Sequence, residues 1–134
     1  MIYPKFVLVI LVAAMLCLPF PSVAGEASKP TLLKRQELSG LSEKEGVMLT
    51  VLISPGDSSP MHRHKAHTFV YVLEGSVVMQ LEGQEPVTLK QGETFYESPE
   101  DIHKVTKNLS TTQSAKFLVF FVKDRGTPLL LPFR

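Results

Sequence analysis

Two of the four histidines in this 134-residue chain are two residues apart, a spacing that suits a metal site. His62 and His64 precede residues 68–75, whose β-branched and aromatic side chains are typical of a buried strand. Side chains two residues apart on an extended chain point to the same face, so these imidazoles could provide half of a metal site. His103, beyond another turn-bounded stretch, could complete the site from a different strand. The alternative is that these histidines are exposed beside a turn.

The spacing of residues between Gly56 and Asn108 resembles the two motifs of the cupin superfamily. The first motif is matched by Gly56, His62, His64 and Gly75. The second motif is matched, with looser spacing, by Gly92, Pro99, His103 and Asn108. A weaker likeness extends from about Thr31 to Pro132. The resemblance is to a small, single-domain, type-2-like cupin, and it implies an all-β jelly-roll barrel, the double-stranded β-helix, with one motif in each half.

The resemblance also implies a divalent transition metal held by His62, His64 and His103, with open positions for water or a substrate. Ligand type alone does not choose among iron, manganese, nickel, copper and zinc. One position departs from the family pattern, because Thr68 stands where a glutamate ligand is usual. The adjacent His67 should point to the opposite face of the strand. The sequence leaves open whether Thr68 or His67 completes the site.

Two classes of function are compatible with such a site. In the first, the protein is a metal-dependent oxygenase, isomerase or lyase that acts on a small organic substrate. In the second, it is a cupin that binds or senses a metal or a small ligand without turnover. Four residues are candidates for a catalytic base by position alone: Tyr71, Tyr96, Glu97 and His67. We interpret them as packing aromatics or surface and solvated groups, so the catalytic residues stay unassigned.

Short apolar segments between glycine- and proline-rich turns predict an all-β sandwich or barrel. The expected strands are residues 31–37, 47–53, 69–73, 76–81, 86–89, 94–96, 102–106, 116–122 and 129–131. Residues 54–60 are predicted to form one long turn, and 76–81 to be the hairpin partner of 69–73. Phe117, Phe120 and Phe121 are expected in the core. The pattern predicts one domain over residues 25–134, with its core at about 31–132.

The first 24 residues have the pattern of a secretory signal peptide. Lys5 supplies a positive charge, residues 6–18 are almost all apolar, and Ser22-Val23-Ala24 offers small residues before a cleavage site. A membrane span is the alternative, but the apolar run is short for one. We therefore expect a mature chain that begins at Gly25, is periplasmic or secreted, and has no membrane contact after cleavage. The only cysteine, Cys17, would be removed.

Charge limits the classes of partner. The chain has 14 lysines and arginines against 13 aspartates and glutamates, and removal of the leader with Lys5 leaves equal numbers. A nearly neutral chain without a basic stripe does not suit nucleic acid. We expect a small-molecule ligand or substrate. We also expect a homodimer formed through the apolar end segments, Leu32-Leu33 and residues 129–131.

Overall fold

The computed structural model describes residues 28–133, and every regular element in that range is a β-strand. The strands are β1 (Lys29–Glu37), β2 (Lys44–Ile53), β3 (Ser58–Ser59), β4 (His62–Arg63), β5 (Ala66–Glu74), β6 (Ser76–Leu81), β7 (Val87–Lys90), β8 (Thr94–Glu97), β9 (His103–Lys107), β10 (Ala115–Asp124) and β11 (Leu131–Pro132). Within these residues no helix is long and apolar enough to cross a membrane. The predicted signal peptide, residues 1–24, lies outside the described residues.

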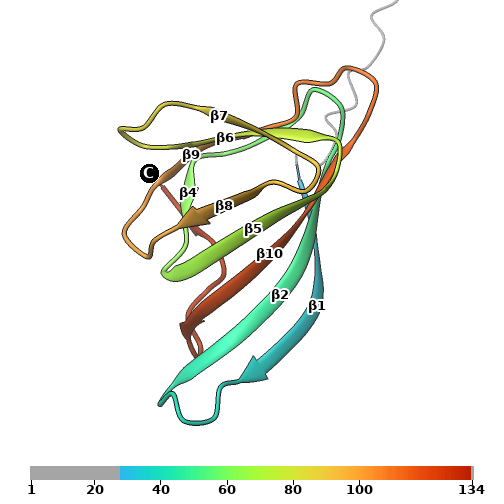
Figure 1. The fold of residues 1–134 in the computed structure, drawn as a ribbon. Coiled ribbons are helices and arrows are strands. Elements are labelled where there is room, and N and C mark those ends of the chain that lie inside the picture. Colours follow the sequence, from blue (N-terminus) through green and yellow to red (C-terminus); the bar gives the residue numbers. More distant parts are fainter. Residues whose placement is uncertain (1–27, 134) are drawn as a thin grey trace, which may run out of the picture.

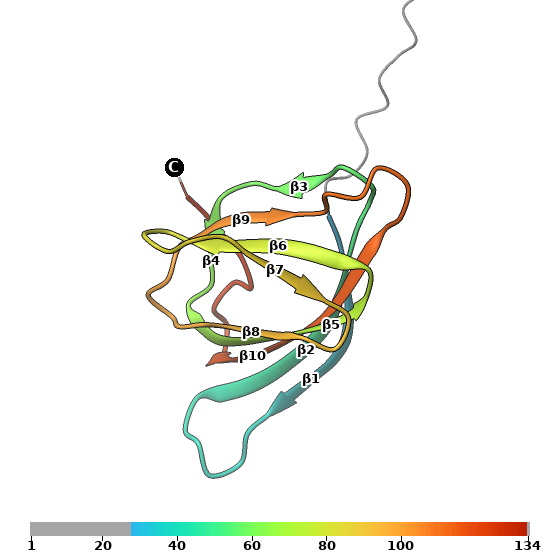
Figure 2. The ribbon, with the colours of Figure 1, turned by 45° about the horizontal axis from the view of Figure 1, so that its top comes forward.

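The strands form two antiparallel sheets that enclose a common core (Figure 1 and Figure 2). One sheet has the order β1-β2-β10-β5-β8, and the other has the order β11-β4-β9-β6-β7 with β3 beside β9. Strands far apart in the sequence are neighbours, since β10 lies between β2 and β5. The architecture is the all-β jelly-roll barrel that the sequence predicts.

Alternation of buried and less buried side chains along the long strands builds the core. In β10, Phe117, Val119 and Phe121 are buried, and the residues between them are only partly buried. Successive strand residues point to opposite faces, so alternate apolar residues cover the inner face of the sheet. Phe120 is consequently not a core residue, which corrects the prediction. Its ring lies on the outer face, with its centroid 6.4 Å from that of Phe69.

The connection from β5 to β6 is a corner between the two sheets, so the predicted hairpin of these segments is wrong. β5 pairs with β10 and β8, whereas β6 pairs with β9 and β7. Gly75 forms this corner with a φ of 70°, and a Cβ on it would lie 2.8 Å from the carbonyl oxygen of Ser114. Glycine tolerates both the conformation and the close approach. A hairpin and a corner can both place glycine at the turn, and the sequence does not separate them.

Asn108, directly after β9, joins three segments of the barrel. Its side chain is buried, and its Nδ2 group contacts the carbonyl oxygens of Ile53, Ser54 and Gln113 as donor. Its Oδ1 accepts a hydrogen bond from the backbone of Ser110. The short strand β3, which lies within the predicted long turn 54–60, pairs with the end of β9 nearby. Asn108 therefore holds the end of β2 and the loop before β10 against β9.

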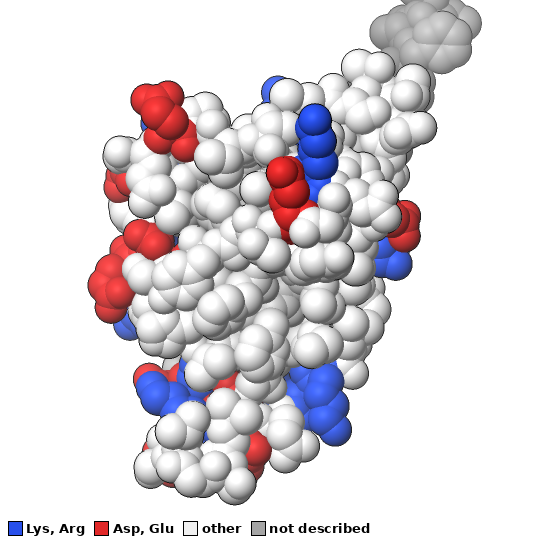
Figure 3. All heavy atoms as spheres, in the orientation of Figure 1, with Lys and Arg blue, Asp and Glu red and all other residues white. Residues whose placement is uncertain are grey.

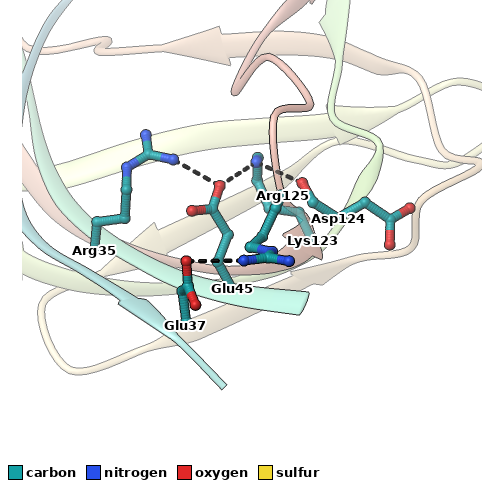
Figure 4. Close-up of polar contacts among 6 residues, drawn as sticks. All are labelled: Arg35, Glu37, Glu45, Lys123, Asp124 and Arg125. Carbon is teal, nitrogen blue, oxygen red and sulfur yellow. Dashed lines mark hydrogen bonds and ion pairs between the residues drawn. The ribbon is translucent and has the colours of Figure 1, made fainter. Parts of the chain in front are cut away.

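A buried ion pair links β2 to β10 (Figure 4). Nζ of Lys123 lies 2.5 Å from Oε1 of Glu45 and donates to the carbonyl oxygen of Asp124 at 2.8 Å. Arg35 of β1 contacts the same Glu45 oxygen at 2.6 Å. Lys123 is 2% exposed and Glu45 is 4% exposed. A buried charge requires a partner, and here the partners come from neighbouring strands. These three residues therefore connect β1, β2 and β10 at one end of the sheet.

Charged side chains of both signs lie on the face seen in Figure 3, mostly nearer its edges than its middle. β1 is an edge strand whose residues are all exposed, and it carries the exposed side chains of Leu32 and Leu33. The free edge of such a strand can pair with another chain. The homodimer expected through this segment stays a prediction.

Candidate metal centre

Three of the four histidines meet inside the barrel. His62 of β4 lies directly opposite His103 of β9, and His64 follows β4 by one residue. The ring centroid of His62 is 4.8 Å from that of His64 and 5.1 Å from that of His103. One ring nitrogen from each residue can be chosen so that all three lie within 4.8 Å of one another. Converging imidazole nitrogens are suited to a divalent transition metal.

Backbone carbonyl groups orient two of the three rings. Nδ1 of His62 lies 2.8 Å from the carbonyl oxygen of Pro60, and Nδ1 of His64 contacts the carbonyl oxygen of Leu129. A carbonyl oxygen only accepts, so Nδ1 is the donor in both rings. In the neutral imidazole the remaining lone pair is then on Nε2, where it is available to a metal.

Burial lowers the pKa of His62 and of His64 below the ordinary value of 6.5. For His62 the hydrogen bond to Pro60 opposes this shift, and nearby His64 and His103 reinforce it. For His64 the strongest opposing effect on the pKa is the negative charge of Glu97. Both imidazoles are therefore neutral at neutral pH, which is the form that binds metals.

Glu97 is a buried acidic residue in contact with this cluster, which corrects its interpretation as a solvated charge. It is 2% exposed, and its Oε1 lies 3.1 Å from Nδ1 of His103. It is the last residue of β8, in which Phe95 is more buried than its neighbours and Tyr96 is exposed. Alternation from Phe95 could have indicated that Glu97 points inward. The sequence prediction ended this strand one residue too early.

Thr68 and His67 point to opposite faces of β5, as strand alternation predicts. Thr68 is fully buried and lines the same cavity as the three histidines, and its hydroxyl donates to the carbonyl oxygen of Ala66 at 3.4 Å. His67 is exposed, with Nδ1 2.8 Å from the hydroxyl of Tyr96. Tyr96 and Tyr71 are exposed as well. His67 and the two tyrosines thus lie on the outer face, away from the histidine cluster.

A cavity of about 150 Å³ adjoins the histidines. Most of its lining is apolar and comes from both sheets: Leu49, Val51, Ile53, Val70, Met79, Phe117, Val119, Phe121 and Leu129. Ser59 is also in the lining, and its Oγ is buried without a hydrogen-bond partner in the described part of the chain. A cavity of this size can hold a molecule about as large as benzene. The arrangement can therefore place a small, mainly apolar molecule beside the three imidazoles.

Comparison with known protein families gives the same assignment as the motifs. Residues 49–121, more than half of the chain, match the family model of the cupin domain. The chain is a cupin. All three histidines of the cluster, and Glu97, lie within the matched part of this cupin. A comparison with curated proteins gives no match.

Solved structures of similar fold include proteins with different described activities. DMSP lyase DddQ from Ruegeria pomeroyi is 22% identical with a TM-score of 0.63, and the match covers 78% of this cupin but only 51% of the lyase chain. A double-stranded β-helix protein from Klebsiella pneumoniae is 14% identical with a TM-score of 0.64, covering 82% and 89% of the two chains. Polyketide cyclase RemF from Streptomyces resistomycificus is 21% identical with a TM-score of 0.55, covering 75% and 80%. At these identities the likeness establishes the fold.

Proposed function

We propose that this cupin binds one divalent transition-metal ion through His62, His64 and His103 and holds a small organic molecule beside it. The observation that carries the proposal is the convergence of three imidazoles from β4, the residues after it, and β9. The donor set fits iron, manganese, nickel, copper or zinc, all of which accept imidazole nitrogen. When bound, such an ion supplies a Lewis acid that polarises a ligand or activates water.

The cavity supports a small-molecule partner. Its lining is mostly apolar and includes Ser59, whose buried hydroxyl has no hydrogen-bond partner within residues 28–133. A lyase and a cyclase are among the proteins of similar fold. These observations support an oxygenase, isomerase or lyase as the enzymatic form of the proposal. The substrate is then a compact organic molecule.

A second candidate function is binding without turnover. It is favoured by the small number of titratable side chains in the cavity. The titratable side chains in its lining are those of His62, His64, His103 and Glu97. A catalytic acid or base must reach the substrate and be free to exchange a proton. If the metal engages the histidines, Glu97 is the one titratable lining residue within 28–133 that remains for that role.

We also propose that the protein is exported. The support is the pattern of Lys5, the apolar residues 6–18 and the small residues Ser22-Val23-Ala24. In an oxidising compartment, a mature chain without Cys17 would be stabilised by its packed core and its metal rather than by disulfides. N-terminal sequencing of the protein purified after expression of the full chain should begin at Gly25. Recovery of an uncleaved chain in the membrane fraction would contradict export.

The metal proposal is tested by metal content and affinity of the purified protein. The wild type should bind one equivalent, and His62→Ala or His103→Ala should lose most of it because two imidazoles hold the ion poorly. His67→Ala is the matched control and should bind normally, since this side chain lies on the outer face. A wild type that binds none of the five metals would overturn the proposal. Oxygen uptake or product formation by the loaded wild type then separates catalysis from binding.

A further inference from the structure

The residue opposite Thr68 provides the carboxylate that Thr68 lacks. Thr68 stands where the first cupin motif usually has its glutamate, and its direct partner across the β5–β8 ladder is Glu97. Directly opposed residues of an antiparallel pair project to the same face of the sheet. Both side chains are buried, and both line the cavity with the three histidines. A carboxylate is therefore present at the same level of the barrel, on the neighbouring strand.

His103 presents a lone pair to this carboxylate. Its Nε2 lies 2.8 Å from the carbonyl oxygen of Val105 and 2.8 Å from Oγ1 of Thr106. A carbonyl oxygen only accepts, so Nε2 carries the hydrogen, and Nδ1 of the neutral ring has the lone pair. Nδ1 lies 3.1 Å from Oε1 of Glu97, which is also an acceptor. Two acceptors this close require a proton or a metal ion between them.

The separation of these two atoms suits a shared metal ion. Two ligand atoms that each lie about 2.1 Å from one ion, at a right angle, are about 3.0 Å apart. The distance between Nδ1 of His103 and Oε1 of Glu97 is 3.1 Å. Within residues 28–133, no lysine or arginine forms an ion pair with Glu97, whose one basic neighbour is the ring of His103. A buried carboxylate with so little compensation needs a further positive charge nearby.

The other two imidazoles belong to the same cavity as this carboxylate. Glu97 and all three histidines line the same cavity. A metal ion bound by the histidine cluster would therefore lie in a cavity that a carboxylate of β8 also lines.

We propose that Glu97 is the fourth protein ligand of the metal, bound through Oε1, and that His103 binds through Nδ1. This inference rests on the proposed function. The carboxylate ligand of the centre has moved from β5 to the paired position of β8, and the three histidines keep their places. Compared with a metal held by three neutral imidazoles alone, the added carboxylate lowers the net charge of the centre by one. The site is then completed by protein without a contribution from Thr68 or His67.

The experiment compares four proteins in calorimetric titrations with Co²⁺. They are the wild type, Glu97→Gln, the exposed control Glu100→Gln, and the exchange variant Thr68→Glu/Glu97→Thr. Loss of a group that only supports a ligand weakens metal binding by about 10–100-fold, so loss of a ligand should weaken it by at least about 100-fold in Glu97→Gln. Glu100→Gln should match the wild type. The exchange variant should bind much more tightly than Glu97→Gln, because its carboxylate returns to the same level of the barrel.

Electron paramagnetic resonance of bound Cu²⁺ separates a ligand from a residue that only positions His103. The spectrum of Glu97→Gln should differ from that of the wild type, because a neutral oxygen replaces a carboxylate among the copper ligands. An unchanged spectrum with weaker affinity would overturn the proposal, and so would wild-type affinity in Glu97→Gln. Circular dichroism of the metal-free variants establishes folding. If Glu97→Gln does not fold, the exchange variant decides, and a folded exchange variant without metal binding would overturn the proposal.

The controls distinguish this proposal from the one on which it rests. If the wild type binds neither Co²⁺ nor Cu²⁺, both proposals fail. If the wild type binds metal and Glu97→Gln binds it equally well, the three-histidine site stands and the fourth ligand fails.

Discussion

Replacement of Lys123 by methionine should lower the free energy of unfolding by about 2–4 kcal/mol. Methionine keeps the length of the side chain but removes the ammonium group, which lies 2.5 Å from Oε1 of Glu45 and 2.8 Å from the carbonyl oxygen of Asp124 (Figure 4). Both members of the ion pair are buried. The replacement therefore leaves a buried carboxylate without its main partner.

The magnitude follows from the partner that remains. Removal of one member of a buried ion pair typically costs about 3–5 kcal/mol. Arg35 still contacts the same oxygen of Glu45 at 2.6 Å, and its side chain is 47% exposed, so water weakens the attraction. The remaining contact with Arg35 therefore reduces the expected loss in the free energy of unfolding. Lys44→Met is the matched control, because its pair with Asp124 is 43% and 63% exposed and should contribute much less than the buried pair.

The pH dependence gives an independent check. The hydrogen bond from Lys123 is the largest cause that lowers the pKa of Glu45 below its ordinary value of 4.5, with Arg35 assisting and burial opposing. A lowered folded-state pKa means that the unfolded chain binds the proton first as the pH falls. The pair should therefore stabilise the fold fully above pH 4.5 and progressively less below it. The difference between the wild type and Lys123→Met should narrow in acid.

Urea denaturation of the metal-free proteins at neutral pH and below pH 4.5 measures both effects. Equal stability of Lys123→Met and the wild type at neutral pH would refute the reasoning. A difference that grows in acid would refute the assignment of the effect to Glu45. A loss in Lys44→Met as large as that in Lys123→Met would show that burial does not decide the strength of these pairs.

Two further predictions concern the loops. Asn108→Leu should lower the free energy of unfolding by about 2–4 kcal/mol, because the carbonyl oxygens of three residues, that of Ile53 buried, and the backbone amide of Ser110 lose a partner. Denaturation that shows no loss would contradict the joining role of Asn108. Gly83→Ala, in open space at a φ of 76°, should cost about 1–2 kcal/mol. Gly75→Ala should cost more than Gly83→Ala, because its Cβ also meets the carbonyl oxygen of Ser114. Equal losses would show that this contact relaxes freely.

Strand alternation explains why much of the candidate site could be predicted from the sequence. The orientation of a side chain on a strand depends on its neighbours along the chain, and this local rule placed Thr68 inside and His67 outside. The same rule failed for Phe120, because the whole apolar run was assigned to the core without regard to its two faces. Applied to β8, it would have directed Glu97 inward with Phe95.

The sequence by itself determined the all-β class, the cupin family, and the three histidines of the candidate centre, since these follow from composition, alternation and motif spacing. Only the tertiary structure decided which strands are neighbours. The pairing of β5 with β8 places Glu97 opposite Thr68, and the corner at Gly75 sends β5 and β6 into different sheets. Pairing depends on contacts between segments that are distant in the chain, and short-range patterns do not encode the register of such contacts.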